Sequence, residues 1–202
     1  MQKIAFDSQS VSPSKVICIG RNYVAHIEEL GNEIPENMVI FNKPNSAISQ
    51  SLKYFTPHCR FEGEICLLII AGKIAGLGLG LDLTHAQLQN TLKQKGLPWE
   101  RAKAFDGSAV LSEFIAFEGE LRDIHFELYH NGTLVQYADH SLMMYKPHEM
   151  ITEIQRFMTV EDHDIIMTGT PKGVGTYQQG DLFEMKLYEK EALLLVSSWK
   201  AK

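Results

Sequence analysis

The segment from Glu62 to Thr84 holds two apolar runs that meet at a short turn, and no other part of the chain restricts the fold as strongly. The first run is EICLLII, and the second is GLGLGLDLT at residues 76–84. Short runs of aliphatic residues next to glycine are typical of packed strands. The sequence therefore predicts two buried strands, with a turn at Ala71 and Gly72 after the first.

Other segments show the same preference for strands, and helices are few and scattered. Further strands are predicted at residues 15–20, 38–44, 125–138, 182–188 and 192–199. The Asn131-Gly132 pair is a strong signal for a two-residue hairpin turn. Helices are predicted at residues 22–31, with Asn22 as N-cap and Gly31 at the end, at 85–96 and at 147–160. This pattern predicts an α+β fold and not a doubly wound parallel sheet.

Length and composition exclude several classes of protein. The 202 residues contain no internal repeat and no Pro/Gly linker, so we expect one domain over residues 1–202. The formal net charge is −6 and no basic run is present, which argues against nucleic acid as a partner. No stretch approaches about 18 consecutive apolar residues, so no membrane span is expected. The N-terminus lacks a secretory signal, and the three cysteines fit free thiols in a cytoplasmic setting.

The GLGLGL segment superficially resembles a dinucleotide-binding fingerprint. That fingerprint needs glycine at its third conserved position, where this chain has Leu81. An acid follows two residues after Gly80 and not about 20 residues later. We therefore expect the glycines to allow close packing between elements.

Glu62 and Glu64 lie one residue apart beside the first apolar run. In a strand, residues i and i+2 share a face, so the two carboxylates would point the same way and repel each other. An exposed strand face with two solvated acids would account for the pair without a ligand. Asp82 adds a third carboxylate inside an apolar segment, although it could instead cap the following helix. Together the three acids favour a site for Mg²⁺ or Mn²⁺, which bind carboxylate oxygens.

Three further features can contribute chemistry, and each has a structural alternative. His26 and Glu29 share a helix face at i, i+3, so the carboxylate can orient the imidazole as a general base, or the two can form an ordinary surface pair. Lys103 can hold a substrate carboxylate or oppose an enolate charge, or it can be solvated. The TGTPKGVG loop can bind an anion or form a plain turn between strands.

Six motifs, taken in order, resemble the fumarylacetoacetate hydrolase family, and most closely its short acylpyruvate hydrolases and oxaloacetate decarboxylases. The resemblance extends from about residue 15 to residue 198. The motifs are IGRNYVAHIEELG, FNKP, FEGE, LDLT followed by LQ, KGLPWERAKAFD and DIIMTGTPKGVG. The resemblance implies a mixed β-sheet roll with a few short helices, and a homodimer.

The resemblance also implies roles for individual residues, and it places His26 and Glu29 on a lid segment. The residues that match the family's ligands for Mg²⁺ or Mn²⁺ are Glu62, Glu64 and Asp82. Those that match its catalytic groups are His26, Glu29 and Lys103. Those that match its substrate contacts are Arg21, Lys43, Gln89 and Thr170.

The chain departs from the family pattern in one place. Where relatives usually read Asp-x-Thr-x-Arg-Asp-x-Gln, this sequence reads DLTHAQLQ, with Ala86 and Gln87 in place of the arginine and the acid. An arginine fork is well suited to a substrate carboxylate or a local ion pair. Its absence leaves the substrate open, and a weakly active relative that only binds metal and keto acids is an alternative.

The expected function is hydrolysis of a C–C bond in small 2,4-dioxo acids of the acylpyruvate type. The 1-carboxylate and 2-oxo oxygens of the substrate would chelate the metal, which would act as a Lewis acid. His26, with Glu29 behind it, would deprotonate a water that attacks the 4-carbonyl, and a metal-held enolate would leave. Decarboxylation of oxaloacetate and isomerisation of 2-oxo-enoic diacids are alternatives at the same site.

Overall fold

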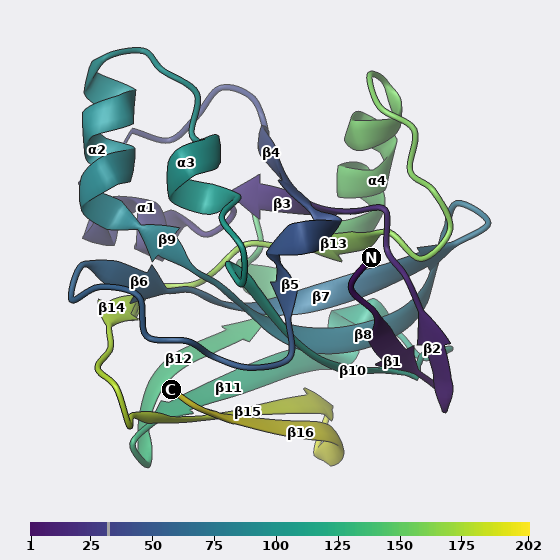
Figure 1. The fold of residues 1–202 in the computed structure, drawn as a ribbon. Coiled ribbons are helices and arrows are strands. Elements are labelled where there is room, and N and C mark those ends of the chain that lie inside the picture. Colours follow the sequence, from purple (N-terminus) through teal and green to yellow (C-terminus); the bar gives the residue numbers. More distant parts are fainter. Residues whose placement is uncertain (32) are drawn as a thin grey trace.

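A large mixed sheet curls into a roll and forms the framework of the molecule (Figure 1). The structure is a computed structural model that describes residues 1–31 and 33–202. Within these residues the strand order is β2-β1-β10-β8-β7-β13-β3-β4, and β5 pairs with β10. The strands of this sheet are β1 Ile4–Phe6, β2 Gln9–Val11, β3 Lys15–Gly20, β4 Val39–Pro44, β5 Ile48–Ser49, β7 Gly63–Ile70, β8 Lys73–Asp82, β10 Ala109–Ala116 and β13 Ile165–Met167.

Two smaller sheets complete the architecture. An antiparallel sheet of order β12-β11-β15-β16 packs beneath β8 and β10 (Figure 1). Its strands are β11 Ile124–His130, β12 Thr133–Asp139, β15 Leu182–Glu189 and β16 Ala192–Lys200. The third sheet contains β6 Cys59–Phe61, β9 Thr84–His85 and β14 Gly175–Thr176.

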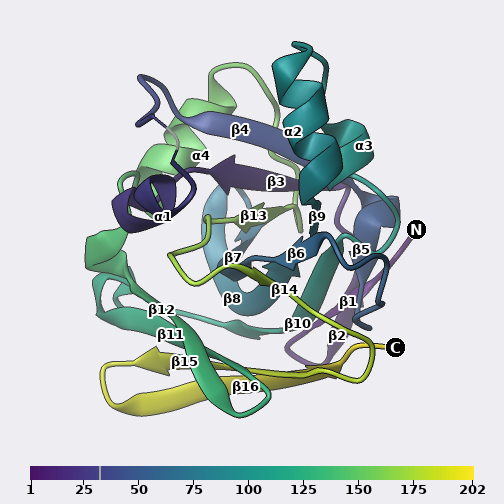
Figure 2. The ribbon, with the colours of Figure 1, turned by 90° about the vertical axis from the view of Figure 1, so that its left-hand side faces the viewer.

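Short helices surround one end of the roll. Figure 2 looks onto this end, where α1, α2 and α3 lie around the strands β3, β6 and β9. The α-helices are α1 Val24–Glu29, α2 Ala86–Gln94, α3 Glu100–Lys103 and α4 Pro147–Gln155. Short 3₁₀ turns are η1 Asn45–Ala47, η2 Leu121–Asp123 and η3 His140–Leu142. The α+β prediction is confirmed, and no helix among the described residues is long and apolar enough to cross a membrane.

The continuous apolar run of β7 results from burial on both of its faces. Ile65, Leu67 and Ile69 belong to the core cluster between the two large sheets. Cys66 and Leu68 alternate with them and belong to a second cluster on the opposite face. A strand covered on both sides has no solvent-facing position, so it needs apolar residues at successive positions.

The glycines of β8 allow close packing, as the sequence predicts. A Cβ atom at Gly78 would lie 2.9 Å from the Phe114 ring, and one at Gly80 would lie 2.8 Å from Cys66 Sγ. These distances are shorter than ordinary carbon contacts, so side chains there would push neighbouring groups away. The GLGLGL segment is therefore a packing feature of β8.

Several predicted boundaries differ from the structure. The helix predicted at 22–31 begins at Val24, because the Asn22 side chain does not cap it. Asn22 Nδ2 donates to the Thr168 carbonyl at 2.9 Å, and Asn22 Oδ1 accepts from the Tyr145 N–H at 2.7 Å. The helix predicted at 147–160 ends earlier, at Gln155. Strands β1 and β2 and helix α3 were not predicted from the sequence.

Candidate active site

Strand pairing brings the three predicted metal ligands together. Asp82, the last residue of β8, donates its backbone N–H to the Glu62 carbonyl at 2.9 Å. Glu64 pairs with Gly80 in the same ladder. One carboxylate oxygen from each of Glu62, Glu64 and Asp82 lies within 4.8 Å of the other two. Glu64 and Asp82 are buried, and Glu62 is partly exposed.

Two lysines and a threonine surround this carboxylate cluster. Lys103 Nζ donates to Asp82 Oδ2 at 2.7 Å and to Glu62 Oε2 at 3.0 Å. Thr84 Oγ1 donates to Glu62 Oε1 at 2.6 Å. Lys43 Nζ lies 2.8 Å from Asp82 Oδ1 as an ion pair. It also donates to the carbonyls of Leu83, Ser108 and Lys103, which holds the ends of β8 and α3 together.

The electrostatics of the cluster depend on burial and on mutual charge. Burial raises the pKa of Glu64 well above its ordinary value, and the Asp82 and Glu62 charges raise it further. Burial opposes ionisation of Asp82 as well, but Lys103 and Lys43 hold its pKa below the usual range. Burial opposes the charge on Lys103, yet Asp82 and Glu62 raise its pKa. Asp82 and Lys103 are therefore a charged pair, while Glu64 lacks full compensation.

These residues fit a hard divalent cation. Three carboxylates at this separation are the oxygen donors that Mg²⁺ and Mn²⁺ prefer. Asp82 Oδ1 is buried and lies beside the Lys43 ammonium, but it accepts no hydrogen bond of good geometry from the described residues, so it has a lone pair left to coordinate a cation. A cation would also relieve the repulsion that raises the Glu64 pKa.

A histidine–glutamate pair lies on α1, beside the same cavity. His26 is buried, and its Nδ1 lies 3.4 Å from Glu29 Oε2. Both Glu29 oxygens accept from the Gly173 N–H, at 3.0 and 3.1 Å. The helix is thus attached to the 168–175 loop through Glu29. With Nδ1–H directed at Glu29, Nε2 is the basic nitrogen of the neutral ring.

One cavity collects eight of the ten predicted site residues. The predicted residues that line it are Arg21, His26, Glu62, Glu64, Asp82, Gln89, Lys103 and Thr170. Glu29 contacts His26 and Gly173 outside that lining. Lys43 is fully buried against backbone carbonyls and Asp82, and it is not among the described residues that line the cavity. Arg21 has a φ of 57°, an uncommon conformation for a residue other than glycine, where the chain turns from β3 toward α1.

Among the lining residues that were not predicted from the sequence are Lys93 and Trp99. Lys93 lies on α2, seven residues after Ala86 and so on a similar face of the helix. Its Nζ lies 5.7 Å from the centre of the Trp99 ring, which also lines the cavity. Partial burial lowers the pKa of Lys93, and the charges of Arg21, Lys103 and Arg60 lower it further. Basic side chains therefore gather at this cavity although Ala86 occupies the usual arginine position.

Sequence and structure comparisons with known proteins point to one family. The model of the C-terminal region of fumarylacetoacetate (FAA) hydrolase matches residues 15–193. Oxaloacetate tautomerase YcgM of Escherichia coli is 37% identical over 187 residues, which cover 83% of this chain and 85% of the relative. The mitochondrial oxaloacetate tautomerase FAHD1 of Bos taurus is 34% identical, over 82% and 83% of the two chains. The structure of fumarylpyruvate hydrolase from Pseudomonas aeruginosa with Mn²⁺ and pyruvate has a TM-score of 0.87 at 27% identity, covering 99% and 95%.

Proposed function

Because the chain belongs to the fumarylacetoacetate hydrolase family, we propose that it is a metal-dependent enzyme that tautomerises a small 2-oxo diacid such as oxaloacetate. One observation carries this proposal. A cluster of three carboxylates and the imidazole of His26 line the same cavity. The two relatives named as oxaloacetate tautomerases support the choice of reaction.

The metal ligands in this proposal are Glu62, Glu64 and Asp82. A divalent cation held by these residues supplies Lewis-acid stabilisation of negative charge on the 2-oxo oxygen of the substrate. Lys103 adds a positive charge that is fixed by two carboxylates and lines the cavity.

His26 transfers the proton in this mechanism. Keto-to-enol conversion breaks a C3–H bond, forms a C2=C3 double bond and places a proton on the 2-oxo oxygen. Nε2 of His26 accepts the C3 proton, and the imidazolium returns a proton to the oxygen. Glu29 keeps the ring oriented and stabilises its charged form, because its carboxylate lies 3.4 Å from Nδ1. The reverse reaction uses the same groups.

The carboxylates of the substrate need cationic and hydrogen-bonding partners. Arg21 and Lys93 line the cavity beside Thr170 and Gln89. An arginine can bind one carboxylate with two hydrogen bonds, and a lysine can bind the other as a point charge. These residues favour a diacid over a substrate with one carboxylate.

Metal removal tests the proposed function directly. In protein stripped with a chelator, the enzyme-catalysed rate at which the absorbance of enol-oxaloacetate decays should fall at least about 1,000-fold, because stabilisation of the developing charge is worth several kcal/mol. Addition of Mg²⁺ or Mn²⁺ should restore the rate, and addition of Ca²⁺ serves as a comparison with a larger ion. Full activity in the stripped protein would contradict the metal assignment. Tight Mn²⁺ binding without turnover of any 2-oxo acid would indicate a protein that only binds these ligands.

Hydrolysis of a 2,4-dioxo acid is the second candidate. The His26–Glu29 pair has the arrangement of a general base for water, and the P. aeruginosa structure belongs to a fumarylpyruvate hydrolase. Acetylpyruvate and oxaloacetate assayed side by side at equal Mg²⁺ distinguish the two. If acetylpyruvate is cleaved faster than oxaloacetate is tautomerised, hydrolysis is the main activity.

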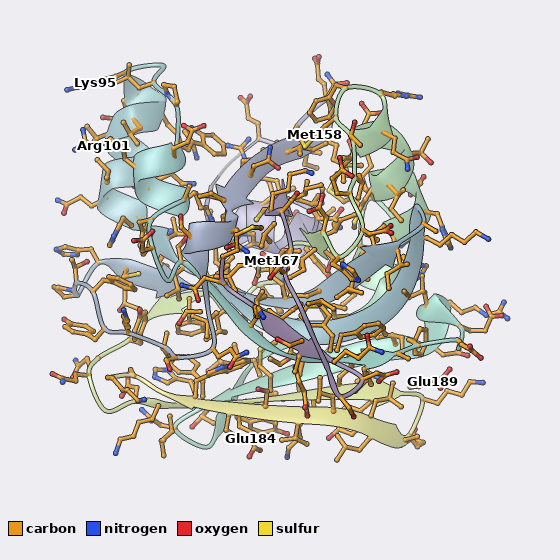
Figure 3. The ribbon with its side chains drawn as sticks, turned by 45° about the vertical axis from the view of Figure 1, so that its right-hand side comes forward. Lys95, Arg101, Met158, Met167, Glu184 and Glu189 are labelled. Atoms are coloured by element: carbon orange, nitrogen blue, oxygen red, sulfur yellow. The ribbon has the colours of Figure 1, made fainter. Side chains whose placement is uncertain are left out.

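Substitution of Lys93 should affect diacids selectively. In Lys93→Met we expect KM for oxaloacetate to rise about fivefold, with a smaller change for acetylpyruvate, because an exposed or partly buried charge pair contributes about 1 kcal/mol. Lys95→Met is the matched control, since Lys95 extends from the C-terminal end of α2 into solvent (Figure 3). Equal KM changes for both substrates would exclude Lys93 as a contact for the second carboxylate.

A further inference from the structure

Gln136 of β12 is a buried polar residue close to the site that neither the motifs nor the proposed mechanism uses. It is 2% exposed, although it belongs to the outer four-stranded sheet. Its Oε1 accepts from the Gly63 N–H at 2.8 Å. Its Nε2 donates to Thr170 Oγ1 at 2.8 Å and to the Pro171 carbonyl at 3.0 Å. One amide group therefore joins two segments of the site that are far apart in the sequence.

The first contact reaches the metal cradle, which consists of Glu62, Glu64 and Asp82. Gly63 lies between Glu62 and Glu64, so its backbone N–H belongs to the short segment that carries both carboxylates. A Cβ atom at Gly63 would lie 2.9 Å from Gln136 Oε1 and 2.9 Å from Leu128. Glycine is thus the residue that lets the second sheet approach this peptide without a clash.

The second contact reaches the loop that holds α1. Thr170 and Pro171 precede Gly173, whose N–H is bonded to both oxygens of Glu29. Gly173 has a φ of 97°, and a Cβ there would lie 1.9 Å from the Val135 carbonyl. The loop therefore lies directly on β12, next to Gln136.

We propose that Gln136 is a positioning residue that fixes the metal cradle and the His26–Glu29 pair in one geometry. The inference rests on the proposed function for the roles of these two groups. An amide accepts and donates at once without carrying charge, so it can satisfy Gly63 N–H and Thr170 Oγ1 beside three carboxylates. A charged side chain at this position would lack one of these capacities and would alter the field at the carboxylates.

A purely structural role would also explain a buried glutamine, so the test needs a control that separates the two. Ser112 is buried in β10, and its Oγ accepts from the Leu79 N–H at 2.8 Å. Ser112→Ala removes a buried hydrogen bond from the large sheet without touching a residue that lines the cavity. It therefore reports what the loss of such a bond does to stability alone.

The experiment compares the wild type, Gln136→Met and Ser112→Ala as purified, metal-free protein. Calorimetric titration measures Mn²⁺ affinity, electron paramagnetic resonance measures the symmetry of the bound Mn²⁺, and hydrogen exchange reports on residues 24–29 and 169–175. In Gln136→Met we expect the Kd for Mn²⁺ to rise 10- to 100-fold, as roughly expected for loss of a group that orients metal ligands. We also expect an altered Mn²⁺ spectrum and about tenfold faster exchange in both segments. Ser112→Ala should show none of these changes.

Unchanged Mn²⁺ affinity and exchange in Gln136→Met, or changes equal to those of Ser112→Ala, would overturn the proposal. If Gln136→Met does not fold, Gln136→Asn replaces it, because the shorter amide keeps a polar group but cannot reach both partners. None of these readouts uses turnover. A wild type that binds Mn²⁺ but converts no 2-oxo acid would therefore refute the proposed function and leave the role of Gln136 to be decided by the variants.

Discussion

Replacement of Glu64 by glutamine should abolish the activity, with a loss of at least about 1,000-fold in kcat/KM. The Glu64 carboxylate is buried, and no lysine among the described residues forms an ion pair with it. A divalent cation would bind its ionised form. Glutamine keeps an oxygen that can accept from the Gly169 N–H, which is 2.7 Å from Oε2 in the native site. The change therefore removes charge with little change of shape.

For the same variant we also expect weaker stabilisation by Mn²⁺, which can be measured without turnover. Mn²⁺ at 100 times the wild-type Kd should stabilise the wild type by about 2.7 kcal/mol, but a variant with 100-fold weaker binding by only about 0.4 kcal/mol. The metal-free variant should melt at the same temperature as the wild type or higher, because repulsion with Asp82 and Glu62 is removed. Thermal unfolding with and without Mn²⁺ measures both quantities.

Glu184→Gln is the control for the Glu64 variant. Glu184 lies on β15 in the outer sheet, far from α2 and α3 in Figure 3, and its side chain is 46% exposed beside Lys186. An exposed ion pair of this kind contributes little to stability. Equal loss of Mn²⁺ stabilisation in both variants, or activity retained in Glu64→Gln, would rule out the proposed metal site.

The convergence of the three carboxylates shows how far local pattern predicts this site. The i, i+2 spacing places Glu62 and Glu64 on one face of a strand. From the turn, Ile70 pairs with Lys73 and Ile69 with Ile74, a register in which Glu62 would face Leu81. A bulge between Leu68 and Ile69 shifts the register by one residue, so Gly63 pairs with Leu81 and Asp82 comes opposite Glu62. A one-residue slip moves a side chain to the other face, and nothing in the sequence indicated this bulge.

Contacts between segments that are distant in the sequence position several site residues, and these contacts could not be predicted from the sequence. Glu29 and Gly173 are separated by 144 residues, and Gly63 and Gln136 by 73. Such contacts have no local periodicity, so only the tertiary packing of the elements creates them. Asn22 failed as a predicted N-cap for a related reason. Its side chain finds better partners at Tyr145 and Thr168, which lie nearby only in the folded chain.

Replacement of His26 by alanine should lower kcat by a factor of about 100 to 10,000, the usual contribution of a general acid–base group. Mn²⁺ affinity should remain within about twofold of the wild type, because His26 lies on α1 and its near polar contact is Glu29, not a metal ligand. The variant therefore separates proton transfer from metal binding. His148→Ala is the matched control, since His148 is an exposed histidine on α4.

Chemical rescue by free imidazole tests directly whether the His26 side chain transfers the proton. Alanine at position 26 leaves space at the cavity wall, so free imidazole should enter and restore part of the activity in a concentration-dependent way. Glu29 should remain bonded to Gly173, so α1 should keep its position and the added base should meet the same carboxylate. Steady-state rates with oxaloacetate and acetylpyruvate, with and without imidazole, measure this effect for both candidate reactions. Rescue of only one substrate would assign the histidine to that reaction. A variant with wild-type rates on both would show that His26 transfers no proton in either.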